Sequence, residues 1–237
     1  MLAISNVSST PSGVVRSRTK AYFNNKSIYR TAPAQLKGVL SGAGHIAIDM
    51  DEVIVNMFVP LIHHYENVYS KSFDLKNVKT DEYNYAKLFD ISPREAQWLV
   101  YSYWNSDIHK DQPAIEGALE SFKALKMNDV KITIVTARQH YAKKQTILWL
   151  KNNGFDEYYD NIVFTNSYSL VGNEENKEDI CRLIDASLLI DDSYNTIKKC
   201  NDIGMDTLWF TGYPRYFWCN VCNTDELYEV ASWKYLE

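Results

Sequence analysis

One stretch of this 237-residue chain constrains its fold more than any other, namely Ile46-Ala47-Ile48-Asp49-Met50-Asp51. The short apolar run is typical of a buried parallel strand, and Asp49 and Asp51 would stand at its carboxyl end. Ligands bind at that end of open α/β sheets. Two carboxylates there can hold Mg²⁺ and present a nucleophile, although a strand that runs into an acidic turn gives the same pattern.

Two other predicted strands also end in polar side chains. The apolar run at 188–190 leads into Asp191 and Asp192, and the β-branched run at 131–135 ends at Thr136. Right-handed crossovers bring the carboxyl ends of parallel strands to one edge of the sheet. Several carboxylates buried together are costly unless a cation neutralises them, and oxygen ligands favour Mg²⁺ over Zn²⁺.

Lys177 lies 14 residues before Asp191, where a helix is expected to begin. Its ammonium would offset the carboxylates and hold a phosphate oxygen as a point charge. An ordinary solvated lysine is the alternative for any single lysine. Its order and spacing relative to the three strand ends favour a place in the site.

These four elements resemble the motifs of the haloacid-dehalogenase-like phosphohydrolases, in the same order and at similar separations from residue 45 to about 215. Asp49-Met50-Asp51-Glu52-Val53 is similar to the first motif, Thr136 to the second, Lys177 to the third and Asp191-Asp192 to the fourth. Within that superfamily the chain looks closest to the 5′(3′)-deoxyribonucleotidases, or type C 5′-nucleotidases.

The sequence departs from that group at three positions. Members often have Gly where this chain has Glu52, and often an acidic residue and an aromatic where it has Asn56 and Met57. The aromatic helps to hold a nucleobase in the family. Its absence bears on the substrate and leaves the predicted chemistry unchanged.

The resemblance implies a two-step reaction on Mg²⁺. Asp49 would be the nucleophile that forms an aspartyl-phosphate, and Asp51 the general acid and base. Thr136, the amide of Ala137 and Lys177 would hold the phosphoryl group. The implied metal ligands are Asp49, the backbone carbonyl of Asp51, Asp191 and Asp192. One of the last two would bind the metal directly and the other through water, and the resemblance leaves open which does which.

Arg138 is a further candidate contact for phosphate or substrate, and pairing on the surface is the alternative. We expect a helix from 93 to about 104, because Ser92 and Glu95 form a capping box around Pro93. Its aromatic residues could stack on a base or could simply pack; they are Trp98, Tyr101 and Trp104.

The strand and helix pattern predicts a doubly wound, Rossmann-like α/β fold with a five-stranded parallel sheet and a small helical cap after the first strand. The predicted core comprises 45–53 and 113–215, the cap 54–112, and a C-terminal extension packed on the core 216–237. A cap in that place can exclude water and select the substrate.

Charge is distributed unevenly along the chain. Residues 1–44 hold six basic residues and no acidic one, which leaves 19 basic against 30 acidic residues in the remainder. The segment has the composition of a disordered targeting peptide for a mitochondrion or plastid, and the alternative is a basic tail of a cytoplasmic protein. The acidic body argues against binding polymeric nucleic acid.

Two other features exclude classes of protein. No apolar run reaches the ~18 residues of a membrane span, so no membrane partner is expected. Cys219 and Cys222 form a lone CxxC, which favours reduced structural cysteines over a zinc site.

Together these features predict a phosphatase that acts on a small phosphorylated compound, with a (deoxy)nucleoside monophosphate as the leading candidate. The alternatives are the same chemistry on a sugar phosphate or other small phosphomonoester, a phosphotransferase, and a catalytically silent module that binds metal or phosphate. A homodimer is compatible with the sequence.

Overall fold

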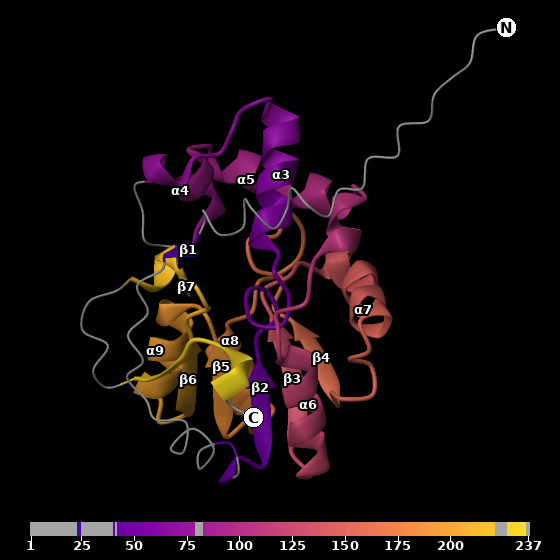
Figure 1. Cartoon of the computed structure of the whole chain (residues 1–237), viewed down its shortest axis with the longest axis vertical. Coiled ribbons are helices and arrows are strands. Elements are labelled where there is room, and N and C mark those ends of the chain that lie inside the picture. The colour runs from indigo at the N-terminus through magenta and orange to yellow at the C-terminus, as the bar shows by residue number, and fades with distance from the viewer. Residues whose placement is uncertain (1–22, 25–39, 41, 79–82, 221–226, 236–237) are drawn as a thin grey trace, which may run out of the picture.

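The computed structural model describes residues 23–24, 40, 42–78, 83–220 and 227–235, and the statements below concern these residues. Their main sheet has six parallel strands in the order β4-β3-β2-β5-β6-β8 (Figure 1). The strands are β2 (His45–Ile48), β3 (Lys131–Thr136), β4 (Asn161–Phe164), β5 (Leu188–Asp191), β6 (Asp206–Phe210) and β8 (Tyr228–Val230).

The predicted doubly wound α/β fold is confirmed, but the predicted number of five strands is wrong. The sixth strand, β8, pairs with β6 at the edge of the sheet. It lies in the segment 216–237, which we predicted to be an extension on the core. Only three residues form this strand, and the described residues between β6 and β8 form a short strand and a 3-10 turn in place of the usual helix, so the sequence carries little periodic signal.

Register explains why the polar strand ends meet. Ile48 in β2 lies opposite Ile134 in β3 and Ile190 in β5. Asp49, one residue beyond Ile48, is therefore level with Asp191, one residue beyond Ile190. The backbone N–H of Asp49 donates to the carbonyl of Ile190 at 2.9 Å, which fixes this alignment.

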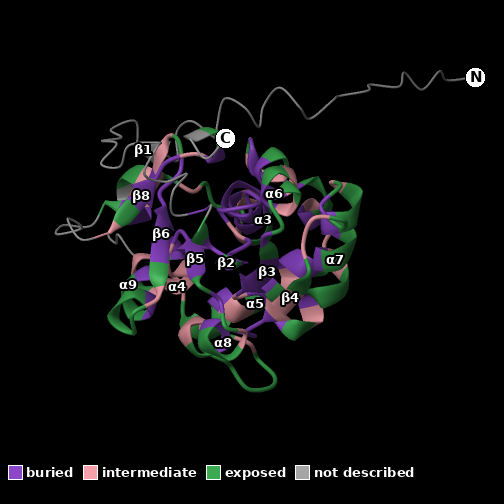
Figure 2. Ribbon diagram, turned by 90° about the horizontal axis from the view of Figure 1, so that it is seen from below, coloured by how far each residue is buried: buried purple, intermediate pink, exposed green. Residues whose placement is uncertain are grey.

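Helices cover both faces of the sheet (Figure 2). One face is covered by α6 (Ala118–Met127), and the other by α8 (Lys177–Leu183) and α9 (Tyr194–Asp202). Helix α7 (Lys143–Asn152) follows the short 3-10 turn η4 (His140–Ala142) near the β4 end. Strand residues buried on both sides explain the nearly continuous apolar runs in the sequence.

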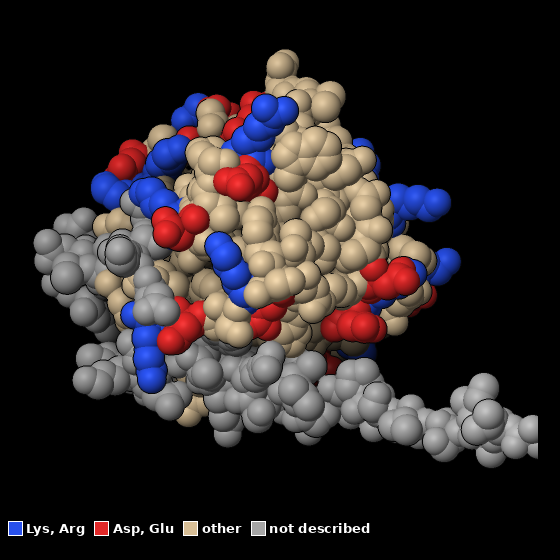
Figure 3. Space-filling view, turned by 90° about the horizontal axis from the view of Figure 1, so that it is seen from above, with Lys and Arg blue, Asp and Glu red and all other residues tan. Residues whose placement is uncertain are grey.

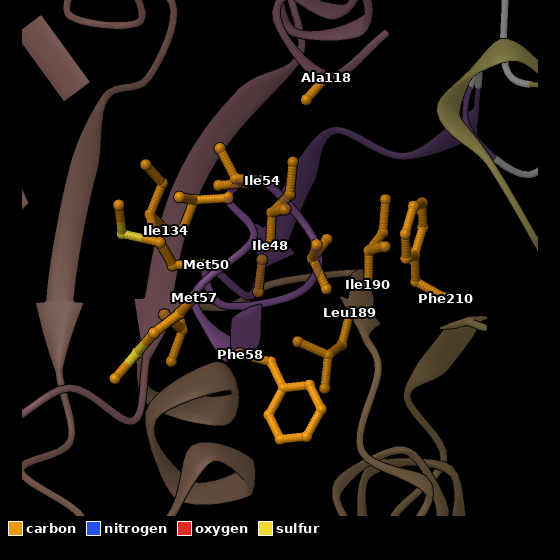
Figure 4. Packing of buried hydrophobic residues seen from close by; sticks show 14 of the residues in the cluster. Ile48, Met50, Ile54, Met57, Phe58, Ala118, Ile134, Leu189, Ile190 and Phe210 are labelled. Atoms are coloured by element: carbon orange, nitrogen blue, oxygen red, sulfur yellow. The ribbon is translucent and has the colours of Figure 1, made fainter. Parts of the chain in front are cut away.

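The central strands and the turn after β2 form one continuous hydrophobic core (Figure 4). Ile48, Ile134 and Ile190 pack side by side, and Met50 and Ile54 from the turn fill the space beyond them. The N–H groups of Val53, Ile54 and Val55 all donate to the carbonyl of Met50. This tight turn holds Asp51 close to the end of β2.

The predicted helical cap is present beyond the carboxyl ends of the strands (Figure 1). It contains α3 (Phe58–Tyr69), η2 (Leu75–Asn77), α4 (Tyr85–Phe89), α5 (Pro93–Trp104) and η3 (Ile108–Asp111). The predicted capping box is also confirmed, because Ser92 and Glu95 bond reciprocally at the start of α5. Seen from the cap end, charged side chains of both signs are scattered over the left half of this face, and a broad area right of its centre is uncharged (Figure 3).

The chain enters and leaves the cap along two adjacent segments. The N–H of Asn56 donates to the carbonyl of Pro113 at 2.9 Å, and the N–H of Ile115 donates to the carbonyl of Ile54 at 2.8 Å. These hydrogen bonds join the two connections to each other. The cap is thus attached to the core by a paired strap beside the turn that carries Asp51.

The remaining elements are short. Strand β1 (Phe23–Asn24) pairs antiparallel with β7 (Arg215–Tyr216), and the 3-10 turns η5 (Phe217–Cys219) and η6 (Trp233–Tyr235) flank β8. Most of the predicted targeting segment 1–44 lies outside the described residues, and so does Cys222. The targeting role and the interpretation of Cys219 and Cys222 as reduced structural cysteines therefore stay predictions. Among the described residues, no helix has the length and apolar character needed to cross a membrane.

Candidate active site

Three carboxylates converge at the carboxyl edge of the sheet. Asp49 follows β2, Asp191 ends β5 and Asp192 comes next, and each offers an oxygen within 4.8 Å of the others. All three side chains are buried. Because these aspartates stand at the ends of two buried, adjacent parallel strands, they come together inside the protein.

Lys177 supplies the positive charge that this cluster needs. Its Nζ lies 2.7 Å from an oxygen of Asp49 and 2.7 Å from an oxygen of Asp191. It is the first residue of α8, the helix that precedes β5, as the sequence predicts. Burial opposes the charged ammonium, but Asp191 and Asp49 outweigh that effect and raise the pKa of Lys177.

Two of these carboxyl groups, those of Asp49 and Asp192, resist ionisation. Burial raises the pKa of Asp49 to about 7, opposed by Lys177 and reinforced by the charges of Asp191 and Asp51. Burial, followed by the charges of Asp191 and Asp49, raises the pKa of Asp192 well above its usual range. One lysine therefore does not neutralise the cluster completely.

This donor set fits a hard divalent cation. It offers only carboxylate oxygens, it is buried, and its unbalanced negative charge is what a bound cation would relieve. Neighbouring donors hold two of the carboxylates in place: the N–H of Ser193 donates to Asp191 at 2.8 Å, and the indole of Trp218 donates to Asp192 at 2.8 Å. Such supporting hydrogen bonds are typical of groups that orient metal ligands.

Thr136 and Ala137 occupy the end of β3 beside this cluster. Thr136 is fully buried, and its side-chain oxygen accepts the backbone N–H of Arg138 at 3.2 Å. This contact leaves the hydroxyl hydrogen of Thr136 as a donor. Ala137 lines the same cavity as Asp49 and Lys177.

Asp51 and Arg138 form a separate pair next to the carboxylate cluster. The side chain of Asp51 is not among the three that converge; it accepts hydrogen bonds from Nε and Nη2 of Arg138, the shortest at 2.6 Å. Arg138 is buried and does not line the cavity, so the alternative of pairing on the surface is wrong. We predicted that Arg138 would contact phosphate or substrate, and in the structure its side chain instead contacts Asp51, a predicted catalytic residue.

A cavity of about 760 Å³ lies over these groups, a size suited to a small organic ligand. Its floor includes Asp49, Asp51 and Lys177. Aromatic rings form part of its wall: Tyr83 from the cap stacks on Trp218 with the ring centroids 4.4 Å apart, and the hydroxyl of Tyr85 donates to that of Tyr83.

The aromatic residues predicted to contact substrate do not line this cavity. Trp98 and Tyr101 are exposed on α5, where Tyr101 packs on Tyr141, and Trp104 is buried against Arg138. Helical spacing groups aromatic residues on one element but does not show which face meets the cavity. Tyr83, Tyr85 and Trp218 were missed, and only the Tyr-Asn-Tyr sequence at 83–85 carries a local signal.

Glu52 links the first motif to the cap. Its backbone adopts a left-handed conformation (φ 63°), and its buried carboxylate accepts the N–H groups of Met57 and Phe58 at 2.8 Å each. The other oxygen accepts the hydroxyl of Tyr83 at 2.6 Å. Glu52, which stands where family members often have glycine, therefore holds both the start of α3 and Tyr83 in the wall of the cavity.

Comparison with known families agrees with this geometry. Residues 44–234 match the sequence model of the family described as 5′ nucleotidase, deoxy (pyrimidine), cytosolic type C protein. The chain belongs to this nucleotidase family. It is a phosphatase of the haloacid-dehalogenase type, as the four sequence motifs indicate. A search of curated proteins finds no match.

Solved structures share the fold of this nucleotidase-family member at low identity. A predicted phosphatase from Clostridium acetobutylicum is 18% identical, with a TM-score of 0.60 over 82% of this chain and 96% of that one. A haloacid dehalogenase-like hydrolase from Streptococcus pneumoniae is 14% identical (TM-score 0.57, 79% and 93%). A predicted phosphoglycolate phosphatase from Haemophilus somnus is 14% identical (TM-score 0.56, 80% and 94%).

Proposed function

We propose that this protein hydrolyses (deoxy)nucleoside monophosphates through an aspartyl-phosphate on Asp49, with Mg²⁺ as cofactor. The observation that carries the proposal is the convergence of Asp49, Asp191 and Asp192 around Lys177 on the floor of a cavity with an aromatic wall. The floor suits a phosphoryl group and a cation, and the wall suits a planar base.

The first step transfers the phosphoryl group to the protein. An oxygen of Asp49 forms a bond to phosphorus while the bond from phosphorus to the ester oxygen breaks. The carboxyl of Asp51 gives its proton to the departing oxygen. In the second step the oxygen of a water molecule bonds to phosphorus, the Asp49–phosphorus bond breaks, and the proton of the water returns to Asp51.

The remaining residues stabilise charge. Lys177 and the hydroxyl of Thr136 would bind phosphoryl oxygens as negative charge develops on them. Asp49, Asp191 and Asp192 would hold Mg²⁺, with the carbonyl of Asp51 as the further ligand that the resemblance implies. Bound there, Mg²⁺ would reduce the repulsion between the phosphate and the carboxylates.

The aromatic wall supports a nucleotide as substrate. Stacking of a base on an aromatic side chain contributes ~1–3 kcal/mol, and both Tyr83 and Trp218 line the cavity next to the carboxylates. A sugar phosphate would gain less from these rings. The preferred base and sugar are left to experiment.

The test is phosphate release from a panel of 5′- and 3′-(deoxy)nucleotides and sugar phosphates, with Mg²⁺ or with EDTA. We expect Mg²⁺-dependent release that favours nucleotides and is lost in Asp49→Asn. Asp156→Asn makes the same chemical change at an exposed position and should leave activity unchanged.

Each other outcome selects a different function. Release that favours sugar phosphates keeps the mechanism and rejects the substrate. Faster turnover with added alcohols, and transfer of phosphate to them, would identify a phosphotransferase. A folded protein that releases no phosphate from any compound would favour a silent binding module.

A further inference from the structure

Arg138 has the most complete set of contacts of any cation in the site, and the mechanism above gives it no role. Nε lies 3.1 and 3.0 Å from the two carboxylate oxygens of Asp51, and Nη2 lies 2.6 Å from Oδ1. A planar fork that bonds both oxygens fixes the plane of a carboxylate, which a single ammonium would not do.

The same guanidinium contacts the cap and its connection to the core. Nη2 also donates to the side-chain oxygen of Gln112 at 3.3 Å, and the guanidinium carbon lies 4.6 Å from the centre of the Trp104 ring at the end of α5. Gln112 in turn donates to the hydroxyl of Tyr103 at 2.6 Å. On the core side, Nη1 donates to Thr146 in α7 at 3.0 Å.

We propose that Arg138 is a positioning residue that holds the Asp51 carboxylate for proton transfer and couples its orientation to the cap. The inference rests on the proposed function, because it assigns Asp51 the acid and base role. Arg138 does not line the cavity, and its side chain acts through Asp51.

The placement of these residues explains how the coupling works. Asp51 stands where the chain is about to enter the cap, and Gln112 stands where it leaves. Arg138 bonds both side chains, and one face of its guanidinium packs against the ring of Trp104 from the cap. A cap displaced from this position removes contacts of Arg138, and the fork that orients Asp51 is then no longer held. Within the described part of the chain, Oδ2 of Asp51 accepts a hydrogen bond only from Nε, which leaves one of its lone pairs for the transferred proton.

The test compares two substrates in Arg138→Lys, which keeps the charge and removes the fork. The value of kcat/KM reports the steps up to departure of the leaving group. The nucleoside leaves from a nucleotide as a strongly basic alkoxide that needs a proton, whereas the p-nitrophenolate that leaves from p-nitrophenyl phosphate is a weak base that needs little assistance. Because general acid catalysis contributes roughly 10²–10⁴-fold, we expect kcat/KM for the nucleotide to fall on the order of 10–100-fold and that for p-nitrophenyl phosphate about threefold or less.

Two further variants make the test specific. Trp104→Phe alters the cap side of the contact and leaves Asp51 in place. It should lower the ratio of kcat/KM for the nucleotide to kcat/KM for p-nitrophenyl phosphate, by a smaller factor than Arg138→Lys does. Arg182→Lys makes the matched change in an exposed ion pair with Asp179 and should leave the ratio unchanged. Circular dichroism confirms that each variant is folded.

The outcomes separate this inference from the proposed function. An active wild-type enzyme whose folded Arg138→Lys and Trp104→Phe variants lose both substrates equally, or lose neither, would overturn the inference alone. A wild-type enzyme that releases phosphate from neither substrate, or an Asp49→Asn variant that keeps its activity, would overturn the proposed function and this inference with it.

Discussion

Lys177 shows how much one residue contributes to this site. It is the cation within 2.7 Å of both Asp49 and Asp191, so its removal leaves two buried carboxylates without compensation. We expect Lys177→Met to lower kcat by roughly 10²–10³-fold and, in EDTA near pH 7.5, to lower the free energy of unfolding by ~3–5 kcal/mol. Urea unfolding and phosphate release measure the two effects. Lys144→Met, at an exposed position, is the control, and a Lys177→Met protein as stable as wild type would contradict the expectation.

Glu52 makes a second prediction, about pH. Burial, followed by the charge of Asp51, raises the pKa of Glu52 to about 8, whereas an unfolded glutamate has its ordinary value near 4.5. The folded state therefore holds the proton more tightly, and this residue costs stability as pH rises from about 4.5 to about 8. The slope is at most ~1.4 kcal/mol per pH unit.

Glu52→Gln should remove that part of the slope. Glutamine can still accept the N–H groups of Met57 and Phe58, and the left-handed backbone carries a side chain in both proteins. Urea unfolding in EDTA between pH 5 and 8.5 should show the variant gaining stability over wild type until about pH 8, then a constant difference. For Glu157→Gln, at an exposed position, the free energy of unfolding should change with pH as it does in wild type. The same pH dependence in Glu52→Gln would contradict the expectation.

At the scale of elements, local pattern predicts some features and not others. The ends of β2, β3 and β5 could be predicted because each is an apolar strand followed by a polar residue, and parallel strands share an edge. The contact between Arg138 and Asp51 could not, because both residues lie beyond the ends of β2 and β3, in turns whose conformation the strand pattern does not determine. The aromatic wall of the cavity was also not predicted, because Trp218 reaches it from a segment far along the chain from the cap.

Helix α5 carries a prediction that separates stability from activity. The hydroxyl of Ser92 accepts the N–H of Glu95, and the Glu95 side chain accepts the N–H of Ser92 at 2.8 Å. Loss of such a cap costs ~1 kcal/mol, so Ser92→Ala should lower the midpoint of thermal unfolding by a few degrees. Ser92 is exposed and distant from the carboxylates, so kcat should stay within about twofold of wild type. A large loss of kcat in the folded variant would show that α5 acts on the site directly.

At the scale of the whole molecule, the C-terminal region is joined by long-range contacts to the cap, the core and the turn after β2. Trp218 stacks on Tyr83 of the cap and donates to Asp192 of the core, while the indole of Trp233 donates to the carbonyl of Val53 in the turn after β2. The C-terminal region also supplies β8 to the sheet. Long-range contacts of this kind leave no periodic trace in a sequence, which explains why the strand count and the wall were missed while the fold class was predicted.

The unbalanced charge of the carboxylate cluster should make the stability of the whole protein depend on Mg²⁺. A ligand that binds only the folded state at 100 times its Kd adds ~2.7 kcal/mol to the free energy of unfolding. Because burial raises the pKa of Asp49 to about 7, a proton competes with the metal at lower pH, so the gain should be larger at pH 8 than at pH 6. Thermal unfolding with Mg²⁺ or EDTA at the two pH values measures it. Asp191→Asn should abolish the gain and the exposed control Asp156→Asn should retain it. An equal gain in Asp191→Asn would mean that Mg²⁺ stabilises the protein from another place.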